Sequence, residues 1–181
     1  MTEGSAEKLN AFGHHRLHIM SMSHQIPGNS YLIFKDKWRV AIFPLEHDAA
    51  EPVGFFIRHE KEALLFIPDT AYVRNRFEGI TILVIECNNT EDILSEKILS
   101  GAIPSFVGRR IRRNHLSLRN VKEFILANNM ARSLREIWLI HLSDTNSSEE
   151  RFIKEIQEAT GVPVYVAQEG TQIYRPSRTT I

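Results

Sequence analysis

The order of strand-like and helix-like segments constrains the fold most strongly. Segments typical of β-strands occur at 14–20, 31–34, 38–43, 53–57, 63–67, 80–85, 137–140 and 162–166, and all but the first, which is a possible strand, are apolar runs. From the second to the fifth, these runs form two pairs joined by short turns, which is typical of β-hairpins. The last three are separated by stretches long enough to be helices. Hairpins followed by βαβ units predict an α/β (α+β) domain with a mixed sheet and helices on at least one face.

Helices are predicted at 4–12, through the 90s and at 117–128. A further helix follows Ser147, which forms a predicted capping box with Glu150 and would be worth about 1 kcal/mol. The continuous apolar runs at 80–85 and 137–140 predict strands that are buried on both faces. We expect one domain over residues 1–167, followed by a polar, loose tail at 168–181.

The composition excludes several classes of protein. The 22 lysines and arginines balance 22 aspartates and glutamates, so no net charge attracts the chain to nucleic acid or to an acidic membrane. A single cysteine, Cys87, excludes an intrachain disulfide and predicts a reducing compartment. No apolar run is long enough to cross a bilayer, and the N-terminus lacks the apolar core of a signal peptide. We therefore expect a cytoplasmic protein with no membrane partner.

Ionisable side chains follow four of the predicted strands. His47, Asp69, Glu86 and His141 each come at or just after the end of an apolar run. A buried charge without a partner costs several kcal/mol, and a divalent metal, most often zinc, is an economical partner for two histidines and a carboxylate. The alternative is that each residue separately caps a strand or belongs to a loop, and the pattern alone leaves both interpretations open.

Five short segments together resemble the metallo-β-lactamase superfamily, in particular its nuclease and phosphodiesterase branch, which includes the transfer-RNA 3′-processing endonuclease. They are His47 to Phe55, Pro68-Asp69-Thr70, Ile85 to Asn88, Asn114 to Ser117, and His141 to Asn146. No single segment is specific, whereas the ordered set is fairly specific. The resemblance covers roughly residues 4–167 and implies part of an αββα sandwich, with mixed sheets and outer helices.

The resemblance also implies roles for individual residues. His47, Asp69 and His141 match metal ligands of the family, which holds one or two Zn²⁺ or Mn²⁺ ions. His115 and Glu86 match a pair that acts on the leaving group. The implied activity is a metal-dependent hydrolysis of phosphodiester bonds, in nucleic acid or a nucleotide, by a metal-activated water.

One departure from the family is large. The His-x-His-x-Asp-His run that supplies most of its metal ligands does not occur here, so the chain resembles the C-terminal two-thirds of a family member. We expect the metal to be weakly held or absent in this chain alone. We also expect a homo-oligomeric partner, or an N-terminal segment missing here, to cover an exposed sheet face. The alternative function is a truncated or degenerate, non-catalytic binding or subunit domain.

A basic run precedes His115. Arg112 and Arg113, together with Arg109 and Arg110, could hold a phosphate group close to the predicted acid–base histidine. The alternative is the solvated end of a charged helix.

Overall fold

The computed structural model describes residues 2–10, 32–33, 37–168 and 170–171. Its helices and strands are α1 (Glu3–Lys8), β1 (Leu32–Ile33), β2 (Arg39–Pro44), β3 (Val53–His59), β4 (Glu62–Ile67), β5 (Ile82–Glu86), α2 (Glu91–Leu99), α3 (Ser105–Asn114), α4 (Leu118–Ala127), the 3₁₀ helix η3 (Met130–Arg132), β6 (Glu136–Ile140), α5 (Glu149–Thr160) and β7 (Val164–Val166). The predicted strand at 14–20 and most of the predicted tail lie outside the described residues.

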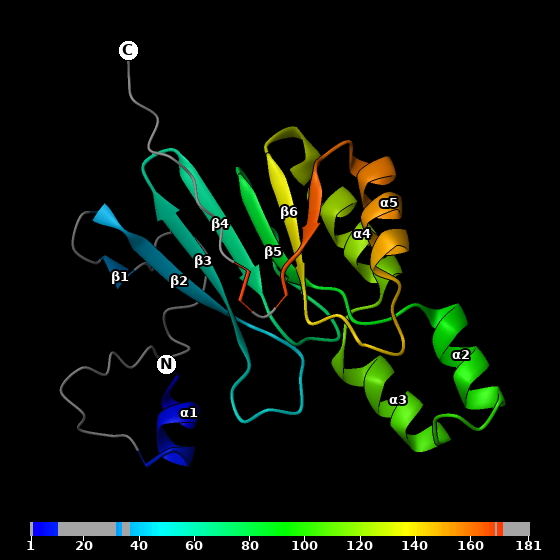
Figure 1. The fold of residues 1–181 in the computed structure, drawn as a ribbon. Helices are drawn as coiled ribbons and strands as arrows, with labels where there is room; N and C mark the ends of the chain where they lie inside the picture. Colours follow the sequence, from blue (N-terminus) through cyan, green and yellow to red (C-terminus); the bar gives the residue numbers. More distant parts are fainter. Residues whose placement is uncertain (1, 11–31, 34–36, 169, 172–181) are drawn as a thin grey trace.

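The seven strands form one sheet in which the spatial order equals the chain order, β1 to β7 (Figure 1). Strands β1 to β4 are antiparallel neighbours, and β4 to β7 are parallel neighbours. This confirms the predicted mixed sheet. The two predicted hairpins also pair with each other through β2 and β3, so they form one continuous antiparallel meander.

This topology brings one end of four strands to the same edge. Because β2 and β4 are both antiparallel to β3, they run in the same direction, and β5 and β6 are parallel to β4. The carboxyl ends of β2, β4, β5 and β6 therefore meet at one edge, which is where ligands collect in open α/β sheets.

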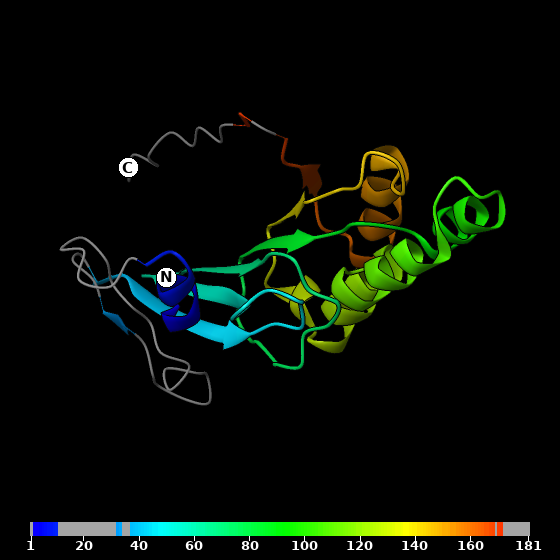
Figure 2. The ribbon, with the colours of Figure 1, turned by 90° about the horizontal axis from the view of Figure 1, so that it is seen from below.

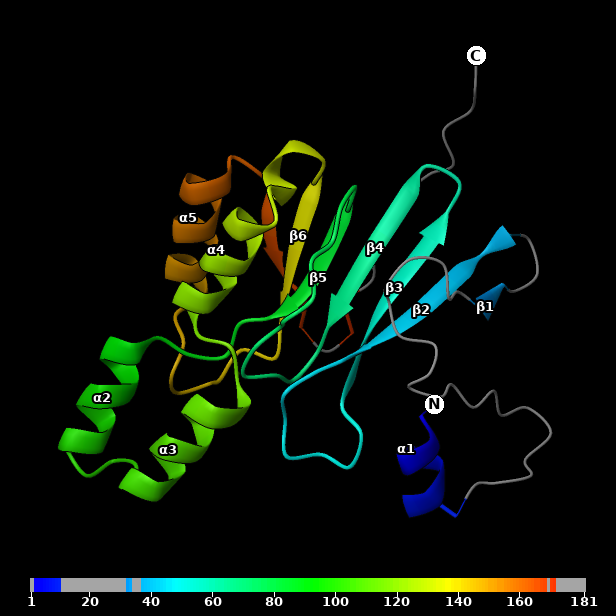
Figure 3. The same ribbon diagram turned by 180° about the vertical axis from the view of Figure 1, so that it is seen from behind.

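Helices α4 and α5 cover one face of the parallel half of the sheet (Figure 3). Their apolar side chains share one core with alternate residues of β5 and β6, namely Val121, Ile125, Phe152, Ile156, Leu83, Ile85, Ile137 and Leu139. The described part of the chain thus forms one sheet of the predicted sandwich together with its outer helices.

The opposite face of the sheet is less covered. Phe55, Phe66, Val84, Trp138 and Ile140 point to this side and are only half-buried. The prediction that 80–85 and 137–140 are buried on both faces is therefore wrong, because within the described residues the helices that pack on β5 and β6 lie on one side (Figure 2).

Helices α2 and α3 form an arm beyond the carboxyl-end edge of the sheet (Figures 1 and 2). The two helices approach closely at Gly108, where an added Cβ would lie 2.3 Å from the Ile98 side chain. Sequence patterns indicated the helix in the 90s but gave α3 no boundaries, because its many arginines leave a narrow apolar face.

Two predicted helix starts or ends need correction. Helix α5 begins after Ser148, and Ser147 instead donates a hydrogen bond from Oγ to the Ser143 carbonyl, at 2.6 Å. The predicted capping box of Ser147 with Glu150 is therefore wrong, because the hydroxyl already has a partner in the preceding loop. Helix α1 ends at Lys8, earlier than predicted. Among the helices that the structure describes, none is long and apolar enough to cross a membrane.

Candidate metal centre

Four ionisable side chains converge at the carboxyl-end edge of the sheet. Asp69 follows β4, Glu86 ends β5, His141 follows β6, and His115 lies between α3 and α4. One ligand atom from each of the four lies within 4.8 Å of the others. Two imidazoles and two carboxylates form a donor set suited to a divalent metal such as zinc or manganese.

Glu86 lies at the centre of this cluster and is fully buried. Its Oε2 accepts hydrogen bonds from the backbone N–H of Thr70, at 2.9 Å, and of Leu116, at 3.2 Å. Its Oε1 lies 2.5 Å from Nδ1 of His115 and 3.0 Å from Nδ1 of His141. The buried carboxylate therefore has partners on both oxygens, which offsets its desolvation and fixes both imidazoles.

His141 has an unusual backbone conformation. Its φ of 55° lies in the left-handed region, which few residues with a Cβ adopt. The Asn88 side chain donates a hydrogen bond to the His141 carbonyl, at 3.2 Å. This turn directly after β6 directs the imidazole to Glu86 and into an ion pair with Asp69.

His115 reaches the cluster through pairing of two loops. The N–H of Asn88 donates to the Leu116 carbonyl and the N–H of Leu118 to the Asn89 carbonyl, both at 2.9 Å. This pairing fixes His115 beside β5. The hydrogen bond to Glu86 raises the pKa of His115, although partial burial opposes the shift. No strand-end pattern indicates His115, and only the family resemblance pointed to it.

His47 lies at the rim of the same site. Its ring centroid is 5.5 Å from that of His115, but His47 is not part of the four-residue cluster. Its Nδ1 accepts a hydrogen bond from the Ala49 N–H, at 3.1 Å, which leaves Nε2 as its ligand atom. Of the three predicted ligands, the structure therefore places Asp69 and His141 in direct contact and His47 alongside.

The arginines of α3 differ in their surroundings. Arg112 bonds to both carboxylate oxygens of Glu91 and to Ser95, so its guanidinium is held by α2. Arg113 is exposed. Arg110 forms an ion pair with Asp48, at 2.9 Å, beside His47. The arginine that reaches the site is thus Arg110, which the sequence indicated only as a member of the run.

Comparison with known proteins shows which fold the chain has. No protein-family model matches the chain. The chain is 29% identical over 116 residues to exodeoxyribonuclease YycJ of Bacillus anthracis, a match that covers 61% of the chain and 42% of that protein. The diiron β-hydroxylase CmlA of Streptomyces venezuelae superposes with a TM-score of 0.55 at 11% identity, over 91% of the chain and 35% of CmlA.

A diphosphatase of the PhnP family superposes with a TM-score of 0.51 at 13% identity, over 88% of the chain and 49% of that protein. The chain carries part of the metallo-β-lactamase fold. The resemblance inferred from the five segments and the partial sandwich are both confirmed. The chain spans less than half the length of each of these three metallo-β-lactamase-fold relatives.

Proposed function

We propose that the chain contributes to a metal-dependent hydrolase that cleaves phosphodiester bonds in nucleic acid or a nucleotide. The observation that carries the proposal is the convergence of Asp69, Glu86, His115 and His141, from four separate segments, at the edge of the sheet where this fold class binds ligands. Two of the named relatives, an exodeoxyribonuclease and a diphosphatase, act on phosphate esters or anhydrides, which supports this class of substrate.

In this proposal, Asp69 and His141 hold the cation, Zn²⁺ or Mn²⁺, and His47 contributes Nε2 from the rim. When bound, the cation supplies an activated water and offsets the negative charge that develops on the phosphoryl oxygens. Glu86 orients His115, and His115 donates a proton to the oxygen that leaves phosphorus. The 2.5 Å contact between Glu86 and His115 supports this pairing.

The set of ligands in this chain is small. Three residues for one or two ions are fewer than a stable zinc site has, so we propose that the chain alone binds the metal weakly. A second layer, from a further segment or from another copy of the chain, would cover the half-buried face around Phe66 and Trp138 and supply further ligands. The single cysteine supports a reducing, cytoplasmic location for this assembly.

The test compares His115→Ala with His59→Ala in Mn²⁺- or Zn²⁺-dependent cleavage of a dinucleotide. His59 stacks on Trp38 at the other end of the sheet and provides a matched control. We expect His115→Ala to lower the rate about 100-fold, the effect of removing a general acid, and His59→Ala to leave it unchanged.

Equal rates for the wild type and His115→Ala would contradict the proposed role of His115. Metal binding without any cleavage would instead support the alternative, a non-catalytic binding or subunit domain.

A further inference from the structure

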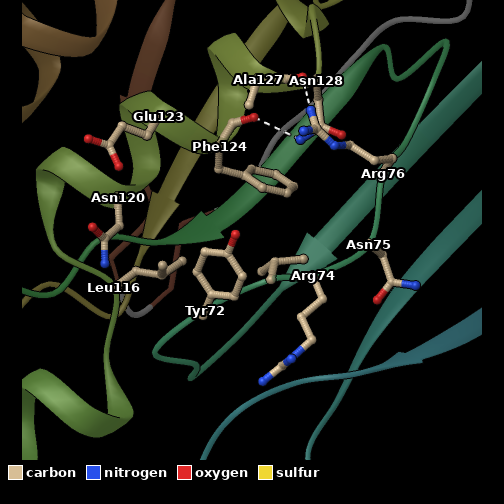
Figure 4. A pocket seen from close by; sticks show the side chains of 11 residues that line it. Tyr72, Arg74, Asn75, Arg76, Leu116, Asn120, Glu123, Phe124, Ala127 and Asn128 are labelled. Atoms are coloured by element: carbon tan, nitrogen blue, oxygen red, sulfur yellow. Dashed lines mark hydrogen bonds between the residues drawn. The ribbon is translucent and has the colours of Figure 1, made fainter.

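A cavity of about 280 Å³ (Figure 4) is lined by Leu116, the residue that follows His115 of the candidate metal centre. Its walls come from the connection between β4 and β5, at 72–76, and from α4 together with the residues that flank it. Its volume lies at the lower end of small-molecule sites, which suits a single small ring system. The proposed roles of the metal-centre residues do not use this cavity.

The cavity and the metal centre share a wall. Leu116 lines the cavity, and its N–H donates to Glu86. Tyr72 lines it from the other side, and its N–H donates to Oγ1 of Thr70, whose own N–H donates to Glu86. The backbone that lines the cavity therefore also holds Glu86, so the cavity lies one layer of residues from the metal centre.

The lining presents flat apolar surface with polar groups at its edge. The Tyr72 side chain stands in the cavity and is 56% exposed, and the Phe124 ring faces the same space (Figure 4). Asn120 adds an amide from α4, whereas the carboxylate of Glu123 forms an ion pair with Arg119, at 2.8 Å. An aromatic face with hydrogen-bonding groups beside it is how proteins bind unpaired nucleobases.

An arginine, Arg74, supplies positive charge in the cavity wall close to Tyr72. Arg74 lines the cavity and forms an ion pair with Glu46, at 2.6 Å, in the loop that leads to His47. A nucleotide bound with its base on Tyr72 would have a cationic group close to its phosphate, since phosphate oxygens favour arginine.

We propose that this cavity binds the unpaired nucleobase adjacent to the cleaved phosphodiester, by stacking on Tyr72. The inference rests on the proposed function and narrows its substrate to single-stranded nucleic acid or a strand end. Asn120 contacts the edge of the base, and the stacking is tolerant of base identity because every base has a π-face.

The test measures the affinity of the full chain and of its variants for two oligonucleotides. Metal is left out so that no cleavage interferes. The probes are a fluorescently labelled short oligodeoxythymidylate and the same oligonucleotide with an abasic residue at its 5′ or its 3′ end. We expect removal of one terminal base to weaken binding to the wild type about tenfold, in line with base–aromatic stacking. In Tyr72→Ala the same removal changes nothing, because the stacking partner is already lost.

Two variants serve as controls. Tyr72→Phe keeps the aromatic face and retains the tenfold discrimination. Tyr165→Ala, which removes another exposed tyrosine, on β7, also retains it. Because Tyr72 is largely exposed, we expect Tyr72→Ala to unfold at the same urea concentration as the wild type.

If removal of the terminal base weakened binding equally in the wild type and in Tyr72→Ala, the proposed nucleobase site would be wrong. It would also be wrong if the wild type did not bind the intact oligonucleotide at millimolar concentration. Failure of the proposed function is seen separately. If the wild type binds the intact oligonucleotide more tightly than the abasic one but never cleaves it with Mn²⁺ or Zn²⁺, the nucleobase site is supported and the proposed hydrolase activity is contradicted.

Discussion

The candidate centre has a strand-held half and a loop-held half. Asp69, Glu86 and His141 lie at or next to the ends of three neighbouring parallel strands, and the sheet fixes their separation. His47 and His115 come from longer connections and depend on local hydrogen bonds for their positions. The sheet therefore positions the strand-held residues, whereas single local contacts position the loop-held ones.

The largest effect should come from removing the buried member of the strand-held half. Glu86→Ala leaves the N–H groups of Thr70 and Leu116 without their acceptor, and each unpaired buried donor costs about 1–3 kcal/mol. Urea unfolding should show this loss, together with loss of metal binding. Glu158→Ala, on the exposed side of α5, is the control and should change stability by less than about 0.5 kcal/mol. Unchanged stability of Glu86→Ala would show that the loops position themselves without it.

The second prediction compares one ligand from each half. His141→Ala should weaken Zn²⁺ or Mn²⁺ binding about 100-fold, the upper end of what losing a supporting residue costs a metal site. His47→Ala should weaken it about tenfold or less, because His47 lies outside the four-residue cluster. Titration calorimetry of the two variants checks this order. The reverse order would place the cation nearer to the loop after β2.

The third prediction concerns the support of His141. Asn88→Ala removes the hydrogen bond to the His141 carbonyl, worth about 1 kcal/mol, and releases the left-handed turn. We expect a loss of this size in urea unfolding and a severalfold loss of metal affinity. Asn75→Ala, in the loop between β4 and β5, should change neither. Full metal affinity in Asn88→Ala would mean that the strand end alone orients His141.

The smallest effect concerns an ion pair outside the centre. A hydrogen bond from Arg151 lowers the pKa of Asp92 to about 2. Because the folded-state pKa lies below the ordinary value of 3.8, the pair stabilises the fold above about pH 4, and this contribution is lost as the pH falls through 2. The pair is largely exposed, so Asp92→Asn should cost about 0.2–1 kcal/mol at pH 7 and only a small part of that near pH 2, where about half of the Asp92 carboxyls in the folded protein are protonated. Unfolding curves at both pH values check this, and an equal difference at both would contradict it.

The sequence pattern predicted the strand-held half and, of the loop-held half, His47, whereas it did not indicate His115. The apolar runs before Asp69 and His141 mark strands, and the order of hairpins and helices indicates that the strand ends share an edge. The position of His115 depends on pairing between 88–89 and 116–118, which no periodic pattern encodes. The engagement of Arg112 with Glu91 and of Arg110 with Asp48 depends on how the α2–α3 arm folds back. Local hydrogen bonding also overrode the capping-box pattern at Ser147.

The position of Cys87 has a practical consequence. The only thiol in the chain follows Glu86 directly and is inaccessible to solvent, and burial raises its pKa well above the ordinary range. In the native state it is a poor nucleophile, so alkylating reagents reach it only when the end of β5 opens. The rate of alkylation therefore measures how often this strand end opens. Slower alkylation of Cys87 in the presence of a divalent ion would report binding of the ion, without any label being attached to the native protein.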